Sequence, residues 1–288
     1  MKQTSWIVLR YLIEHASPEA QPDLSHYISE QARVALGAVY STDQSPWRAI
    51  PSLGNQLRFI HYSWFIPFLH PFGPSDKECF ISALDRRTQQ KLSSYFQLAS
   101  SLPALSPIAA RFFHARLFSW VTASCDELTP RTLLPSHPLN LLLDLTKTEL
   151  QQVANLLGLR DLASEIKYII RKHQVTTIQA ALTQREKEVL KTLLVHPPRP
   201  IFPSLHLDKW DGDETSLKNI LHHRGLNRLS KALFGCHPAL LWHLSHQLDT
   251  GRAKIIHRFC TDVKQDSLKE MLINQALAAV STLRNHHE

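Results

Sequence analysis

Two histidines and an aspartate recur at three-residue intervals near the C-terminal end of the chain, as His243-x-x-His246-x-x-Asp249. Side chains three residues apart on a helix can reach a common metal ion, as His and carboxylate ligands do in helical metal sites. The leucines of the same segment set the apolar face of that helix, with His243 at its edge and the other two side chains progressively farther away. A solvated or partner-facing helix accounts for the same residues, and no second ligand cluster accompanies them. We therefore predict no metal site.

Other patterns that carry chemistry are incomplete. An acidic run surrounds Gly212, and its members are Asp208, Asp211, Asp213 and Glu214. An EF-hand loop needs acids at its first, third and fifth positions and glycine at its sixth, which this run does not supply. Asp213 is better explained as the cap of the next helix. The glycine patterns of phosphate cradles, dinucleotide turns and nucleophile elbows are absent from the sequence. We expect neither an enzyme nor a cofactor or small-molecule substrate.

The cysteines and the N-terminal sequence indicate the compartment. Four cysteines stand alone without a Cys-x-x-Cys pair, at Cys79, Cys125, Cys236 and Cys260. We predict buried free thiols rather than a redox pair or a zinc site. The first apolar run is too short for a signal peptide, and no stretch of about 18 apolar residues could span a bilayer. We expect a cytoplasmic protein.

Helix-start signals recur along the chain while alternating strand patterns are scarce, which predicts an all-α protein. Capping boxes, in which Ser or Thr precedes Glu or Gln by three residues, begin at Ser75, Thr146, Thr176, Thr183 and Ser267. Gly158 is expected to end the helix that begins after Thr146, and Asp161 to cap the next one. Four short helices would then lie between 146 and 196. Such short helices need neighbours, which predicts short helical hairpins stacked in one or two domains.

The length of 288 residues suits two domains of about 100 to 200 residues each. Three prolines between 129 and 138 mark the predicted boundary. We predict an N-terminal helical domain with irregular loops, 1–135, and a C-terminal helical domain, 136–288.

Positive charge is concentrated in the second of these domains. The segment 215–258 has seven Lys and Arg against one acid, Asp249, so it holds +6 of the formal net charge of +7. It also carries six of the 17 histidines and is predicted to be helical throughout. The field of such a segment is not selective for the kind of anion, so acidic protein, anionic lipid and nucleic acid are all possible partners.

One short segment resembles a DNA-binding element. Residues 182–190, LTQREKEVL, are similar to the opening helix of LuxR-type DNA-binding domains. Together with a sequence pI of about 9.3, this supports an alternative hypothesis, a helix-turn-helix-like DNA-binding regulator. Those domains continue within a few residues into a recognition helix that enters the major groove, whereas Pro197-Pro198-Arg199-Pro200 follows here. We interpret the segment as a well-capped amphipathic helix and expect no nucleic-acid partner.

A broader resemblance covers about 139–259. It is carried by 157–166 (LGLRDLASEI), 210–213 (WDGD), 224–233 (RGLNRLSKAL) and 241–252 (LWHLSHQLDTGR), together with His237-Pro238. These segments resemble the chlamydial-type SctK proteins, which are accessory subunits of type III secretion systems.

The resemblance implies a non-enzymatic cytoplasmic adaptor of the secretion sorting platform, peripheral at the inner-membrane face. Such an adaptor joins the inner-membrane ring subunit SctD to the pod protein SctQ and, through SctQ, to SctL and the ATPase. A cationic face could dock an acidic partner, with electrostatics setting encounter rate and orientation. The residues that we predict for this face are Arg224, Arg228, Lys231, Arg252 and Lys254. Trp242 is predicted either as an aromatic anchor for the partner or as a core residue.

Overall fold

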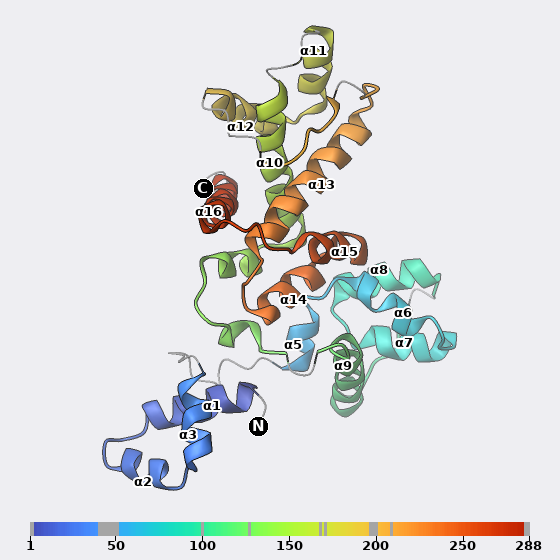
Figure 1. Cartoon of the computed structure of the whole chain (residues 1–288). Helices are drawn as coiled ribbons and strands as arrows, with labels where there is room; N and C mark the ends of the chain where they lie inside the picture. Colours follow the sequence, from blue (N-terminus) through green and yellow to red (C-terminus); the bar gives the residue numbers. More distant parts are fainter. Residues whose placement is uncertain are drawn as a thin grey trace. The chain divides into compact units, whose positions relative to one another are not determined.

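The computed structural model describes residues 3–39, 52–98, 101–125, 128–166, 169, 172–195, 201–207 and 210–284. The proline run 197–200 and Asp208 lie outside these ranges. Within them, every element of secondary structure is a helix, which confirms the predicted all-α class (Figure 1). No helix of the described ranges is long and apolar enough to cross a membrane.

Contacts between residues divide the chain into two compact units. Unit 1 contains Met1–His137 together with His237–Thr250, and unit 2 contains Pro138–Cys236 together with Gly251–Glu288. The sequence predicted a single boundary after 135, with all later residues in the second domain. The structure differs because it assigns His237–Thr250 to unit 1, and the predicted basic segment 215–258 therefore belongs to both units.

Unit 1 is built from short helices. Its first three are α1 (Gln3–Glu14), α2 (Ala20–His26) and α3 (Glu30–Gly37), and α1 contacts both of the others. The remaining ones are α5 (Leu53–Leu57), α6 (Ile66–Leu69), α7 (Pro74–Ser82), α8 (Arg86–Phe96), α9 (Pro107–Val121) and α14 (Pro238–Gln247), with 3-10 turns η1 (Tyr62–Trp64) and η2 (Arg131–Leu133).

Aromatic side chains form much of the core of unit 1. Phe68 of α6 packs edge-to-face on Phe80 of α7 with ring centroids 5.0 Å apart, and Phe80 packs on Phe113 of α9 at 4.8 Å. Leu117 and Val121 of α9 are buried in the same cluster. These contacts fix which side of α9 faces the core.

Helix α14 belongs to unit 1 because two tryptophans enclose one of its histidines. The ring of His246 stacks on Trp242 with centroids 3.8 Å apart and on Trp64 of η1 at 3.9 Å. Trp64 Nε1 also donates a hydrogen bond to the carbonyl of Leu248, and the amide of His61 donates to the carbonyl of His246. Trp64 and Leu248 are 184 positions apart, so no local sequence pattern predicts this docking.

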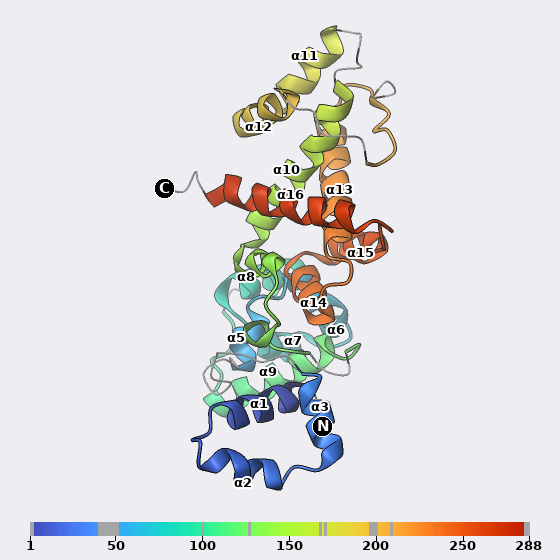
Figure 2. The same cartoon turned by 60° about the vertical axis from the view of Figure 1, so that its left-hand side comes forward.

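Unit 2 contains longer helices. They are α10 (Lys147–Ile166), α11 (Lys172–Ala181), α12 (Gln184–Val195), α13 (Glu214–Ala232), α15 (Thr250–Phe259) and α16 (Asp266–Arg284), preceded by η3 (Pro138–Asp144). Figures 1 and 2 show α10 and α13 crossing each other, and α16 contacts both of them.

Two glycines allow α10 and α13 to meet backbone to backbone. A Cβ on Gly158 would lie 2.0 Å from the carbonyl oxygen of Leu221, and a Cβ on Gly225 would lie 1.5 Å from that of Ala154. No real Cβ could occupy either position, so only glycine permits this approach. The prediction that Gly158 ends a helix is wrong, because α10 continues through it to Ile166. Its role is close packing between helices rather than C-capping.

The capping signals are partly confirmed. The amide of Thr146 donates to Glu149 Oε2 at 2.6 Å, and the amide of Glu149 donates to Thr146 Oγ1 at 3.3 Å. The same reciprocal pair joins Thr183 and Glu186. The boxes at Ser75 and Ser267 also mark helix starts, because α7 and α16 begin one residue before them, although neither serine is the cap. The box at Thr176 is not a helix start, because this residue lies inside α11. The described residues between 146 and 195 form three helices, rather than the four predicted.

Candidate functional site

Arg228, which we predicted for partner binding, lies inside unit 2 and is only 1% exposed. Its guanidinium donates to the two carboxylate oxygens of Asp161 at 2.5 and 3.2 Å and to Gln275 Oε1 at 2.8 Å. The guanidinium carbon also lies 5.2 Å from the ring centroid of Phe202. The predicted role is wrong because the charge is buried and neutralised within the unit. The predicted capping role of Asp161 is wrong for the same reason, since this carboxylate is the partner of Arg228 in the middle of α10.

Trp242 is a core residue of unit 1. It is 8% exposed and belongs to the hydrophobic cluster that includes the aromatic side chains of α6 and α7. Of the two interpretations of Trp242, the structure supports the core and excludes an exposed anchor.

Arg224 and Arg252 are half-buried and held by hydrogen bonds. Arg224 donates to two carbonyls of the preceding loop, the closer being that of Pro203 at 2.6 Å. Arg252 Nε donates to His222 Nε2 at 2.8 Å. His222 Nδ1 therefore carries the ring proton and donates to Asn155 Oδ1 at 2.7 Å. Both arginines keep part of their surface in solvent, and both have a fixed position.

Lys231 and Lys254 lie at the surface, as predicted, and the structure adds Arg258. Lys254 and Arg258 are exposed, while Lys231 is half-buried with its ammonium donating to Thr261 Oγ1 at 3.0 Å. We call four cations of α13 and α15 the basic surface: Arg224, Lys231, Lys254 and Arg258. Arg252 lies about 160° around α15 from Lys254, so it is on the opposite side of that helix. Arg258 could have been identified from the sequence, because it follows Lys254 by four residues on the same helix face.

The two helices that carry the basic surface are neighbours, and their charges interact. The ring of His223 on α13 packs edge-on against Phe259 of α15, with centroids 5.3 Å apart. Burial lowers the pKa of His223, and the charges of Arg224 and Arg258 lower it further. The pKa of His257 is lowered by burial alone. Positive charges are therefore crowded between α13 and α15, and an acidic partner would relieve their repulsion.

The histidines and the aspartate of the C-terminal motif do not form one site. Nε2 of His243 donates to the carbonyl of Thr129 at 2.9 Å, and burial lowers the pKa of His243 to about 4. His246 is the ring enclosed by the two tryptophans, and Asp249 lies beyond the end of α14 at Gln247. Among the described residues, no group of three or more His, Cys, Asp or Glu is placed to hold a metal ion. The four cysteines are free and half-buried, rather than fully buried as predicted.

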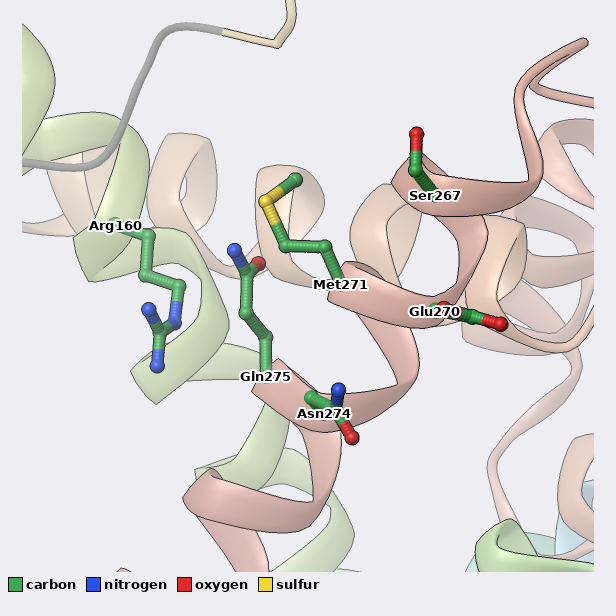
Figure 3. Close-up of a pocket in the computed structure, with 6 residues that line it drawn as sticks. All are labelled: Arg160, Ser267, Glu270, Met271, Asn274 and Gln275. Atoms are coloured by element: carbon green, nitrogen blue, oxygen red, sulfur yellow. The ribbon is translucent and has the colours of Figure 1, made fainter.

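A shallow pocket of about 440 Å³ lies between α10 and α16 of unit 2 (Figure 3). Its lining residues are Arg160, Ser267, Glu270, Met271, Asn274 and Gln275. The side chains of Arg160 and Gln275 extend into the space between the two helices, whereas Glu270 points away from it (Figure 3). Burial lowers the pKa of Arg160, and the charge of Arg228 lowers it further. The lining contains no nucleophile paired with a base, so its chemistry is that of a polar surface depression.

Comparison of the chain with protein-family models, with curated proteins and with solved structures found no match.

Proposed function

We propose that this chain is a non-enzymatic adaptor of a type III secretion sorting platform, linking the inner-membrane ring subunit SctD to the pod protein SctQ. The observation that carries the proposal is the basic surface on α13 and α15. Arg224 is held in place by hydrogen bonds, while Lys254 and Arg258 are exposed. A fixed pattern of positive charge suits the recognition of an acidic protein face, because it steers encounter and sets orientation.

The residues that resemble SctK proteins support a scaffolding role for unit 2. Segments 157–166 and 224–233 contain the two glycines of the α10–α13 crossing and both members of the buried Asp161–Arg228 pair. These residues hold two long helices in one arrangement. They stabilise the packing of the helices, and a well-defined helical scaffold with a charged outer surface is what an adaptor requires.

The proposal is tested by binding to purified partners. The nuclease-treated chain is immobilised and incubated with SctQ, and separately with the cytoplasmic domain of SctD, from the same organism. We expect at least one of them to bind, and the triple variant Lys231→Glu, Lys254→Glu and Arg258→Glu to weaken that binding by about tenfold or more. Lys191→Glu, at an exposed position of α12, is the control for an equivalent charge reversal outside the basic surface.

The other results of this binding assay would each contradict the adaptor proposal or decide between it and the DNA-binding regulator. If neither partner binds the wild-type chain, the adaptor proposal fails. If the chain instead retains one duplex DNA sequence over others, the helix-turn-helix-like regulator replaces it. DNA binding without sequence preference that disappears with added salt would not support the regulator, since any basic surface gives that result. Arg228 is unsuitable for charge reversal, because Glu at this position would face Asp161 inside the unit.

A further inference from the structure

Helix α9 presents two large apolar side chains, one turn apart, on the outside of unit 1. Its inner residues Leu117 and Val121 are buried, whereas Ile108 is 80% exposed and Phe112 is 59% exposed. The small exposed residues Ala115 and Ser119 continue the same face, while Trp120 lies farther round the helix and packs on Phe68. Exposed apolar side chains that lie together on a folded protein commonly mark an interaction surface. We call this exposed side of α9 between 108 and 119 the α9 stripe.

Two arginines border the α9 stripe. At about 100° per residue, Arg111 lies on one side of Ile108 and Arg116 lies on the far side of Phe112, with small residues of the helix between them. Both arginines are exposed. Within the described ranges, neither guanidinium has a hydrogen-bond or ion-pair partner. Their charges are therefore available to a molecule that covers the stripe.

Helix α9 carries no acidic side chain, and Arg111 and Arg116 are its only Lys or Arg residues. Covering the apolar stripe brings a partner within reach of Arg111 and Arg116, so a partner with negative charge at its edges gains favourable contacts and a basic one is repelled. Arginine and aromatic residues are also enriched, and lysine depleted, in protein–protein interfaces.

We propose that the α9 stripe binds an acidic amphipathic helix of a partner protein. Apolar residues of that helix would cover Ile108 and Phe112, while its flanking carboxylates would pair with Arg111 and Arg116. The stripe is about 17 Å long, so about three turns of helix suffice to cover it. Flanking charges of this kind select partners in the same way as the e and g positions of coiled coils.

Two other occupants of the stripe are disfavoured. A second copy of this chain, docked about a twofold axis, would bring the same arginines from both copies together. Helices that lie in a membrane surface have a broad apolar face. The α9 stripe is instead narrow and bordered by cations, and the other side of α9 is held in the core of unit 1.

The test uses the full chain and a fluorescent synthetic peptide of about 18 residues, with leucines on one helical face and glutamates beside them. Fluorescence anisotropy measures its binding, and a scrambled peptide of the same composition is the matched probe. We expect the amphipathic peptide to bind more tightly than the scrambled one, and we expect its binding to weaken with added salt. The variant Arg111→Glu with Arg116→Glu, and separately Phe112→Ser, should each lower the affinity about tenfold.

The matched control is Arg86→Glu with Arg87→Glu, two exposed arginines at the start of α8 that give the same change in net charge. It should bind the peptide like the wild-type chain, and all variants should keep the wild-type melting temperature because the positions are exposed. Equal binding of the scrambled peptide, or no loss in the α9 variants, would overturn the proposal. So would binding of phosphatidylglycerol vesicles without peptide binding, or a dimer in sedimentation that the α9 variants abolish. The outcome is independent of the SctD and SctQ assay, because the basic surface lies in unit 2.

Discussion

Replacing Gly158 or Gly225 by alanine tests the crossing of α10 and α13. In an isolated helix, Gly→Ala stabilises by about 1 kcal/mol, so helix propensity alone predicts a gain from either change. In this protein the new Cβ would lie 2.0 Å from a backbone carbonyl oxygen at Gly158 and 1.5 Å from one at Gly225, where real Cβ atoms stay beyond 3.0 Å. The two helices would have to separate by about 1 Å in the first variant and about 1.5 Å in the second to reach that limit.

The size of the effect follows from what the separation disrupts. Overpacking a well-packed interface costs about 1–3 kcal/mol. The Asp161–Arg228 pair joins the same two helices, so its geometry is disturbed as well. After the gain in helix propensity, we expect each alanine to lower the free energy of unfolding by about 1–2 kcal/mol. Because one separation of the helices relieves both clashes, the double variant should cost less than the sum of the two single variants.

Urea unfolding followed by circular dichroism measures these changes. Gly37→Ala is the control, since a Cβ at this position of α3 meets nothing within 4 Å. It should be neutral or more stable than the wild-type chain. If Gly158→Ala is as well tolerated as Gly37→Ala, or if the two crossing variants are simply additive, the close approach of the backbones is refuted.

Three further predictions concern buried polar and aromatic groups. Asp161→Ala leaves Arg228 buried without its counter-charge and should lower the free energy of unfolding, measured in urea, by about 3–5 kcal/mol. Asp161→Leu with Arg228→Met should lower it far less, and equal losses of stability in the two variants would contradict a buried ion pair. The pKa of His243 is about 4 in the folded chain and 6.5 ordinarily, so the stability that its neutral ring contributes is complete above about pH 6.5. That stability falls by up to about 3 kcal/mol as the pH drops to 4. The variant His243→Gln should therefore show a flatter dependence of melting temperature on pH over this interval. A pH dependence equal to that of the wild-type chain would contradict the prediction. Trp64→Ala removes one side of the stack on His246 and should cost about 3 kcal/mol, with faster hydrogen exchange in α14 than in α9; equal exchange in both helices would count against the docking of α14.

Local interactions made part of the fold predictable. The boxes at Thr146 and Thr183 work as expected because each joins groups three residues apart. Asp213 also caps α13 as predicted, accepting a hydrogen bond from the amide of Ser216 at 2.6 Å. The role of Gly158 could not be predicted from its neighbours, because a glycine that ends a helix and one that allows another helix to pack closely look identical in the sequence.

The basic surface was predictable only in part. Counting charges located the segment 215–258 and Lys254, but it could not separate exposed from buried cations. Arg228 is neutralised by Asp161, which lies 67 positions away in the sequence. The α9 stripe could not be predicted from the sequence, because its apolar residues are of the same types as those that α9 buries. Only packing decides which of them remain in solvent.

The helical class, the two confirmed capping boxes and the concentration of positive charge could be predicted from the sequence, because they depend on composition and on hydrogen bonds between near neighbours. Long-range packing is what joins α14 to unit 1, buries Arg228 and holds His243 and His246 apart. Each of these depends on side chains more than 60 positions apart in the sequence, and on the burial that brings them together. Burial is a property of the packed chain, which is why no local pattern contained it.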